Sequence, residues 1–495
     1  MPFTGQTSQA VYGAGTAVIG DSIAAGAQDG EANIYGVHGN NWFHYLCLAS
    51  AGKIQHVWNA GIGGQTTAQI VPRIVTDILP KKPTRCVLQM GTNDTDPLNQ
   101  TLPNFTTAIQ TLLAAGIQPI LVTIPPAGTA AISAPVATAT ASTTGGTLAA
   151  GTYGYRVAAT NDVTNGVTLA SVEVTVTTTG STGSVTLTWA AVPGATGYKV
   201  YGRTPGAELL IAIITQGGSV PTMGYVDTGA AAPAGALPSS NTTASALTTL
   251  VRTKITGVNN VITRLAQRYG LPLVDMYSFL VDPSTGMYKT GWTKEGTHPS
   301  VMATKLMGQY AASVLAPYYT PSAVYLAGDN ADPTCIVSNP LLLTNNGVVP
   351  QSWSAYGGSG TAESITTDSS VEGAVLQISR ADFTPRYVSA PTLTTGWSVG
   401  DKIAISGRIS LTGADANGGL GTFGMECNGS GNPLTWIGQM SLCSDTPGGF
   451  CTFYFEGIIP PGTTNLEWSA SLAYGPITMK LGQLTARNLT AEGIA

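Results

Sequence analysis

Three short apolar runs near the start of the chain end abruptly in polar turns that contain glycine. Residues 16–19 lead into a Gly-Asp-Ser turn that ends at Ser22, residues 54–58 into a glycine-rich segment, and residues 86–90 into a Gly-Thr-Asn-Asp turn around Asn93. Runs of this kind, bounded by such turns, are typical of buried strands. Open α/β sheets bind ligands at the carboxyl ends of their strands. The polar residues after these runs are therefore candidates for one shared functional site.

Helical periodicity lies between and after these strand-like runs. Residues 104–116 predict a helix, and residues 117–124 predict the next buried strand. Apolar side chains between residues 251 and 265 recur at steps of three and four, on one face of a helix that ends at Gly270. This alternation predicts an α/β fold class.

A fourth polar segment, with Glu295 and His298, lies just before another predicted helix. Together the four segments resemble, in order and spacing, the SGNH (GDSL-type) hydrolase family, whose motif blocks carry Ser, Gly, Asn and His. The resemblance covers roughly residues 10–125 and 240–318. It implies a flavodoxin-like, three-layer α/β/α core and the hydrolysis of carboxylic esters.

The resemblance gives each block a role. Ser22 is the nucleophile and His298 is its base, because a free serine hydroxyl attacks an ester poorly. The oxyanion hole consists of the backbone N–H groups of Ser22 and Gly64 and the side-chain amide of Asn93. Gly64 is chosen because the Gly-Gln-Thr sequence that it begins matches the family's pattern.

Two aspartates and one glutamate complete the predicted site. Asp21 and Asp94 are expected to support the site without contacting the substrate. Where the family carries Asp-x-x-His, this chain has Glu295, whose extra methylene requires a shifted backbone or a different rotamer to reach the imidazole. Glu295 is the predicted acid, and two alternatives stay open: a Ser22–His298 dyad, and Asp275 at the end of the strand-like residues 271–275.

The remaining residues predict two β-sandwiches. Short alternating strands with regular turns fill residues 127–239, and because the α/β pattern resumes afterwards, this sandwich is predicted to be inserted into the hydrolase domain. It resembles fibronectin type III modules. It either overhangs the catalytic face or serves as a spacer. The hydrolase domain then comprises residues 1–126 and 240–320.

Residues 330–495 contain alternating stretches and no convincing helix, and they loosely resemble jelly-roll carbohydrate-binding modules. Four of their tryptophans are candidates for stacking on sugars, although tryptophan in a sandwich more often belongs to the core; they are Trp353, Trp397, Trp436 and Trp468.

Composition restricts the partners. Only 9% of residues are charged, against a usual share of about 25%, and the net charge is −5, so nucleic-acid binding is not expected. The sequence contains no run of about 18 apolar residues, so we expect no membrane span. The six cysteines have no zinc-binding spacing, and we expect no metal or cofactor. Cys47 and Cys86 are predicted buried thiols, and Cys443 and Cys451 are close enough in sequence to bridge a loop.

These observations predict a serine esterase that removes O-acetyl groups from a bacterial surface polysaccharide, either O-antigen or capsule. The first six residues form neither a basic nor an apolar leader, and with the low charge this favours a bacteriophage tail fibre or tailspike, located in the virion or outside the cell. Other tail proteins are then expected partners, and a homotrimer is allowed but not required. The alternatives are an inactive receptor-binding fibre, supported by the Glu295 departure, and a secreted bacterial carbohydrate esterase.

Overall fold

The computed structural model describes residues 14–26, 41–163, 165–215, 224–319, 324–357, 361–380, 386–417, 420–429, 435–473 and 476–494. A ten-stranded sheet runs through this part of the chain in the order β12-β4-β3-β1-β2-β20-β17-β22-β15-β14. Its first five strands are parallel: β12 (Leu273–Val274), β4 (Gln118–Val122), β3 (Arg85–Gln89), β1 (Ala14–Gly20) and β2 (Ile54–Gly61).

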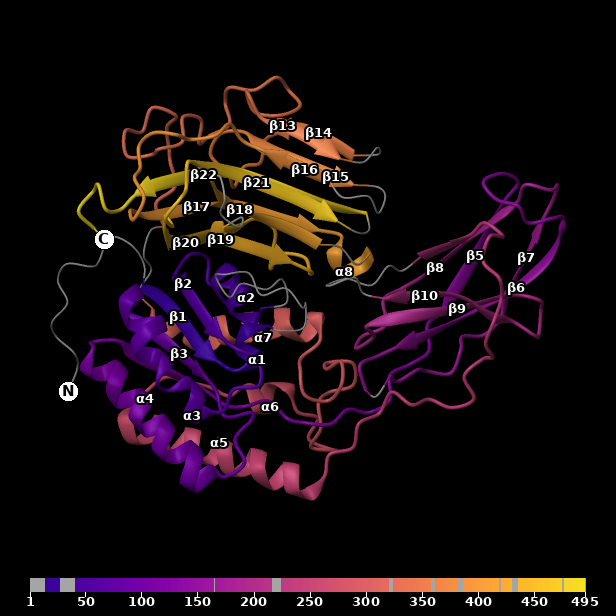
Figure 1. Ribbon diagram of the computed structural model, residues 1–495, viewed down its shortest axis with the longest axis horizontal. Helices are drawn as coiled ribbons and strands as arrows, with labels where there is room; N and C mark the ends of the chain where they lie inside the picture. Colours follow the sequence, from indigo (N-terminus) through magenta and orange to yellow (C-terminus); the bar gives the residue numbers. More distant parts are fainter. Residues whose placement is uncertain are drawn as a thin grey trace.

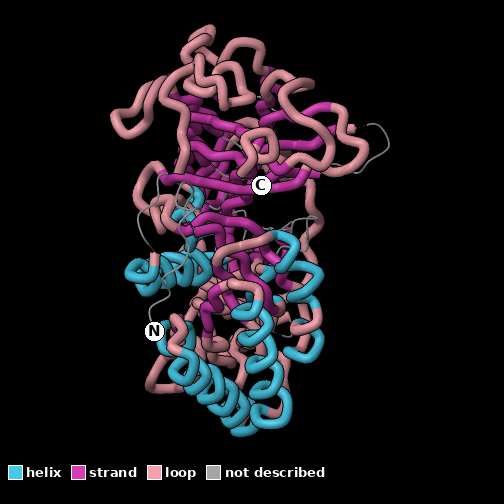
Figure 2. Tube along the Cα trace, turned by 90° about the vertical axis from the view of Figure 1, so that its left-hand side faces the viewer, coloured by secondary structure: helices cyan, strands magenta, loops and turns pink. Residues whose placement is uncertain are grey.

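Helices cover both faces of this parallel part, as Figures 1 and 2 show. They are α1 (Ser22–Ala25), α2 (Trp42–Ala49), α3 (Thr67–Ile70), α4 (Leu102–Ala114), α5 (Thr249–Tyr269), α6 (Met276–Leu280) and α7 (Val301–Leu315), with shorter helical turns at Ile74–Ile78, Leu79–Lys81, Pro97–Thr101 and Ala316–Tyr318.

Alternate side chains of the buried strands pack into two separate hydrophobic cores, one on each face of the sheet. Val18 and Val87 pack with α2 and α7 on one face, whereas Ile19 and Leu88 pack with α4 and α5 on the other. Burial on both faces explains why these strands read as continuous apolar runs. The predicted three-layer α/β/α core is confirmed, and the helix predicted to end at Gly270 ends there, with Gly270 in the left-handed region at φ 64°.

In its described residues, the inserted segment forms a seven-stranded sandwich that projects to one side of the α/β core (Figure 1). One sheet has the order β10-β9-β6-β7 and the other β11-β8-β5. The strands are β5 (Ala137–Ser142), β6 (Gly151–Thr160), β7 (Val174–Thr178), β8 (Ser184–Trp189), β9 (Gly197–Arg203), β10 (Leu209–Thr215) and β11 (Gly224–Asp227). The finer resemblance to fibronectin type III stays a prediction.

The C-terminal residues form a second sandwich with antiparallel sheets. Five of its strands extend the large sheet, and five others form a sheet in the order β13-β16-β21-β18-β19. The elements are β13 (Ser354–Gly357), β14 (Thr361–Thr366), β15 (Val375–Arg380), β16 (Arg386–Ser389), β17 (Lys402–Thr412), α8 (Ala414–Asn417), β18 (Leu420–Asn428), β19 (Thr435–Leu442), β20 (Cys451–Ile458), β21 (Asn465–Ala473) and β22 (Ile477–Asn488).

This sandwich shares its core with the α/β part, which the sequence did not predict. Strands β2 and β20 meet at one parallel bridge between His56 and Phe455, and Tyr45 of α2 packs into the sandwich core. The ring of His56 lies 4.9 Å from that of Phe455, and the ring of His44 lies 5.8 Å from it. Burial lowers the pKa of His56 to about 3, so this imidazole is neutral and serves as an aromatic packing group.

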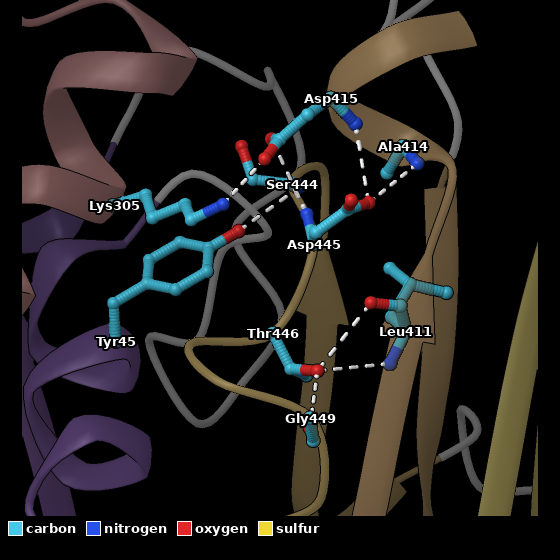
Figure 3. Close-up of polar contacts among 9 residues, drawn as sticks. All are labelled: Tyr45, Lys305, Leu411, Ala414, Asp415, Ser444, Asp445, Thr446 and Gly449. Atoms are coloured by element: carbon cyan, nitrogen blue, oxygen red, sulfur yellow. Dashed lines mark hydrogen bonds and ion pairs between the residues drawn. The ribbon is translucent and has the colours of Figure 1, made fainter.

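Polar contacts complete this junction (Figure 3). Lys305 of α7 forms an ion pair with Asp415 of α8, and the Tyr45 hydroxyl accepts a hydrogen bond from the Ser444 N–H at 3.2 Å. Asp445 in turn caps α8 by accepting from the N–H of Ala414 at 2.7 Å. The α/β core and the C-terminal sandwich are therefore joined by both an apolar and a polar contact surface.

The structure decides two possibilities that the sequence left open in the C-terminal residues. Trp468 is buried and stacks on Phe423 with ring centroids 5.1 Å apart, so it belongs to the core and cannot bind a sugar. No disulfide joins Cys443 to Cys451, and the Cys451 thiol donates to the carbonyl of Pro447 at 3.2 Å.

The other tryptophans and the two thiols predicted to be buried differ in how far they are buried. Trp353 and Trp397 are partly buried against the sandwich core, and Trp436 is half-buried on β19. Cys86 is a buried thiol, whereas Cys47 is only half-buried on α2. None of the helices in the described ranges has the length and apolar character that crossing a membrane requires.

Candidate active site

Ser22 lies at the sharp junction between β1 and α1. Gly20 ends the strand, and a Cβ there would lie 1.9 Å from the carbonyl oxygen of Gln89, so only glycine fits. Asp21 then caps α1 by accepting the N–H of Ile23 at 3.0 Å. Ser22 is consequently the first residue of the helix, where a backbone N–H has no partner within the helix.

Three side chains from distant parts of the sequence form one hydrogen-bonded series. The Ser22 hydroxyl lies 2.9 Å from Nε2 of His298, and Nδ1 of the same imidazole lies 2.5 Å from Oε1 of Glu295. Ser22 and His298 are 276 residues apart in sequence. The geometry is that of a nucleophile, a base and an acid that orients the base.

A tight turn explains how a glutamate reaches the imidazole. Thr293 and Pro299 pair in an antiparallel bridge, and Gly296 takes a left-handed φ of 95° between them. The Glu295 side chain folds back over this turn, so that its Oε1 also accepts the backbone N–H of His298 at 2.7 Å. The extra methylene is therefore accommodated within the turn. Glu295 Oε2 is buried without a hydrogen-bond partner.

Two further contacts hold this turn, and no motif in the sequence indicated either of them. The Thr293 hydroxyl donates to the carbonyl of His298 at 2.6 Å, and the buried Tyr288 hydroxyl donates to the carbonyl of Thr297 at 2.7 Å. Burial and the nearby Glu295 carboxylate raise the pKa of Tyr288 well above its ordinary value, so the hydroxyl keeps the proton that it donates. Such long-range partners carry no local motif.

Gly64 and Asn93, the other expected oxyanion donors, follow β2 and β3, the two strands that flank β1 in the sheet. Gly64 has a left-handed φ of 76°, and a Cβ there would meet no atom within 4 Å, so the residue faces open space. Asn93 follows β3, and its Nδ2 donates to the carbonyl of Gln65 at 3.0 Å. An amide NH₂ group has two protons, so one ties Asn93 to the segment after Gly64 and this bond does not use the other.

The two supporting aspartates are fully buried behind these donors. Asp21 also accepts the N–H of Thr92 at 3.2 Å, and burial raises its pKa to about 6. Asp94 accepts from the backbone N–H of Thr67 at 2.8 Å and from the hydroxyl of Thr101 at 2.8 Å. These bonds fix the turns after β1, β2 and β3 relative to one another.

Asp275 and the other histidines do not contact the Ser22–His298 pair in the part of the chain that the structure describes. Asp275 caps α6: its oxygens accept from the N–H and hydroxyl of Ser278 and from the hydroxyl of Thr123, and no contact joins it to His298. His44 and His56 are buried at the junction with the C-terminal sandwich, and His38 lies outside the described residues. Across the described ranges, no cluster of three or more His, Cys, Asp or Glu side chains forms a metal-binding group.

The insert contacts the catalytic turn directly. At its neck, Thr129 and Ser245 pair in an antiparallel bridge, and the N–H of Gly128 donates to the carbonyl of Gly296 at 2.8 Å. Farther along, a Cβ on Gly194 would lie 3.0 Å from the carbonyl of Thr293. The insert therefore touches the turn that carries His298, and its role, as an overhang of the catalytic face or as a spacer, stays a prediction.

Comparisons with known proteins agree with this geometry. Residues 18–150 match the GDSL-like lipase/acylhydrolase family, a range that holds Ser22, Gly64 and Asn93 but ends before His298. The uncharacterized lipoprotein YqeF of Bacillus subtilis (strain 168) is 36% identical over 94 residues, which are 17% of this chain and 38% of that protein. The match therefore spans well under half of that relative.

Solved structures resemble parts of the chain at low identity. A putative lipolytic protein of the G-D-S-L family from Desulfitobacterium hafniense DCB-2 is 15% identical, covers 61% of this chain and 99% of its own, and gives a TM-score of 0.32. The enzymatically active domain of bacteriophage CBA120 tailspike protein 4 is 10% identical over 31% of this chain and 21% of its own, with a TM-score of 0.26. The CBM22-1 xylan-binding domain of Paenibacillus barcinonensis Xyn10C is 16% identical, covers 29% of this chain and 90% of its own, and gives a TM-score of 0.22.

The strand-end serine, its contact with His298 and the matched residues 18–150 lead to one conclusion: this part of the chain is similar to the GDSL-like lipase/acylhydrolase (SGNH) family.

Proposed function

We propose that the protein is a serine esterase that removes O-acetyl groups from a bacterial surface polysaccharide. The observation that carries the proposal is the Ser22–His298–Glu295 series, because a serine hydroxyl bonded to an imidazole that a carboxylate orients is the arrangement that activates a serine nucleophile. No metal or cofactor is needed for this reaction.

The reaction would follow from these contacts. The Ser22 hydroxyl attacks the acyl carbonyl while Nε2 of His298 takes its proton, and the Glu295 carboxylate stabilises the resulting imidazolium. The oxyanion receives hydrogen bonds from Ser22 N–H, Gly64 N–H and Asn93 Nδ2. The imidazolium then protonates the sugar oxygen, which leaves. A water molecule, deprotonated by the same imidazole, releases acetate from Ser22.

A polymeric substrate is supported by the architecture. An acetyl group offers little binding surface, and two β-sandwiches flank the esterase core, one of them against the catalytic turn. The low charge content and the many small polar residues support a bacteriophage tail fibre or tailspike that acts on O-antigen or capsule, in the virion or outside the cell. Mass spectrometry of purified virions would test that location.

The inactive receptor-binding alternative depended on the departure at Glu295. Since the Glu295 carboxylate lies against the imidazole of His298, this departure no longer argues against catalysis.

The decisive experiment compares wild type, Ser22→Ala and Ser313→Ala, which changes an exposed serine of α7. We expect acetate release from 4-nitrophenyl acetate and from acetylated host polysaccharide to fall by about 10⁴-fold or more in Ser22→Ala only. Equal and negligible rates for wild type and Ser22→Ala on both substrates would refute the esterase proposal and favour the receptor-binding fibre.

A further inference from the structure

The backbone just before Asn93 is held by two charged side chains from other parts of the fold. The N–H of Thr92 donates to Oδ2 of Asp21 at 3.2 Å. The carbonyl oxygen of Thr92 accepts a hydrogen bond from Nζ of Lys254, on α5, at 2.8 Å. That carbonyl belongs to the peptide bond between Thr92 and Asn93. The Lys254 ammonium therefore holds the same peptide unit that positions Asn93.

Helix α5 packs closely on the turn that it holds. A Cβ on Gly91 would lie 3.1 Å from Cγ1 of Val258, and a Cβ on Gly257 would lie 2.7 Å from Cγ of Pro97. Residues three and four positions apart share one face of a helix, so Gly257 and Val258 lie on the same face as Lys254. Since helix and turn leave so little space between them, the half-buried Lys254 side chain reaches the turn from a fixed backbone position.

Two buried carboxylates interact with the Lys254 ammonium. Asp21 and Asp94 are both fully buried, and both act electrostatically on Lys254. Burial lowers the pKa of Lys254, whereas the carboxylates of Asp94 and Asp21 favour its charged form. Asp21 also caps the helix that begins with Ser22. The ammonium is thus linked by charge to the same carboxylates that fix the turns at the strand ends.

The side chain of Asn93 is held separately from its backbone. Its Nδ2 donates to the carbonyl of Gln65 at 3.0 Å. An oxyanion donor is effective only when its N–H is already oriented before the negative charge develops. A displacement of about 1 Å in a reacting group can cost about 10²-fold in rate. A residue that holds the backbone of such a donor can therefore affect the reaction without touching the substrate.

We propose that Lys254 is a positioning residue of the esterase reaction: its ammonium holds the Thr92–Asn93 peptide and thereby orients the Asn93 amide toward the oxyanion. This inference rests on the proposed esterase function. It adds a residue that lies outside the four polar segments of the sequence. Lys254 and Thr92 are 162 residues apart, and only the packing of α5 brings them together.

The kinetic test compares Lys254→Met and Lys254→Arg with Arg252→Met as the matched control. Arg252 is an exposed cation of the same helix and also donates to a backbone carbonyl, that of Thr285, at 2.8 Å. On 4-nitrophenyl acetate, we expect Lys254→Met to lower kcat about tenfold and to change KM by less than about twofold. Lys254→Arg keeps a charged donor and should retain at least about a third of the kcat. Arg252→Met should stay within about twofold of wild type.

A second background shows whether Lys254 acts through Asn93. In Asn93→Ala there is no amide left to orient, so adding Lys254→Met should change kcat by less than about twofold. Equal losses of kcat in the two backgrounds would overturn the positioning role. A loss that appears in KM instead of kcat, or equal kcat values for Lys254→Met and Lys254→Arg, would overturn it as well.

Hydrogen exchange followed by mass spectrometry separates this inference from the esterase proposal, because exchange needs no turnover. We expect the backbone N–H groups of residues 91–94 to exchange about tenfold faster in Lys254→Met than in wild type or Arg252→Met. If wild type hydrolyses no ester, the esterase proposal fails. Faster exchange would then still support Lys254 as the residue that holds the turn, and unchanged exchange would overturn it. Ester hydrolysis at equal kcat by wild type and Lys254→Met refutes the role of Lys254 and leaves the esterase proposal intact.

Discussion

The two halves of the active site are built in different ways. Ser22, Gly64 and Asn93 stand at the ends of neighbouring parallel strands, and buried aspartates fix the turns that carry them. His298 and Glu295 stand on a tight turn without regular structure, held by single contacts from Thr293, Tyr288 and the neck of the insert. Ser22, Gly64 and Asn93 are thus positioned by the sheet, whereas His298 and Glu295 are positioned by the residues that pack on their turn.

The largest expected effect lies in the turn. His298→Ala removes the only imidazole in contact with Ser22 among the described residues, so we expect the kcat on 4-nitrophenyl acetate to fall by about 10⁴-fold or more. His44→Ala is a poor control because it opens a buried site, whereas a surface change such as Ser313→Ala leaves the core intact. A loss below tenfold would show that another group deprotonates Ser22.

Glu295→Gln tests whether the turn supplies a triad or a dyad. The amide cannot stabilise the imidazolium as a carboxylate does, so we expect the kcat to fall by roughly 10³-fold with an unchanged fold by circular dichroism. Glu295→Asp should also lose activity, because the shorter side chain does not reach Nδ1 from this backbone. If Glu295→Gln kept more than a third of the activity, the site would work as a Ser22–His298 dyad.

Asn93→Ala probes the sheet half of the site. We expect the kcat to fall by about 10²–10³-fold with little change in KM, since an oxyanion donor acts mainly in the transition state. Asn99→Ala, which removes an exposed amide bonded to Asp96, is the matched control. A rise in KM with a normal kcat would mean that Asn93 serves only to hold the Gln65 carbonyl.

Gly296→Ala should have the smallest effect on kcat of the four changes. It tests whether the contact between the insert and the catalytic turn matters for activity. Its φ of 95° strains any other residue, and the new Cβ would lie 3.1 Å from both Gly128 and Ser245. We expect a loss of about 1–3 kcal/mol in stability and of about tenfold in kcat. Gly206→Ala carries similar strain at φ 75° with no atom nearby, so it should lower the Tm slightly and leave kcat unchanged. Equal kcat values for Gly296→Ala and Gly206→Ala would show that the contact between the insert and the catalytic turn does not affect catalysis.

The sheet half of the site was predictable from the sequence because its geometry is local. Gly20 permits the close approach to Gln89, and the residues that follow each buried strand meet at the same edge of a parallel sheet. The strand ends therefore made Ser22 and Asn93 candidates, and the family resemblance gave these two residues and Gly64 their expected roles. Glu295 and His298 were identified by their order and spacing within the family pattern, but the manner of their contact was not.

Only the tertiary structure decided how a glutamate replaces an aspartate, which residues hold the catalytic turn, and how the domains join. The reach of Glu295 depends on the left-handed turn at Gly296, and that turn is held by Gly128 from the insert neck. The shared core at Phe455 arises from segments that lie far more than a hundred residues apart, because His56 of β2 pairs with Phe455 of β20. Contacts of this range leave no periodicity in the sequence, because each partner satisfies its own local pattern independently of the other.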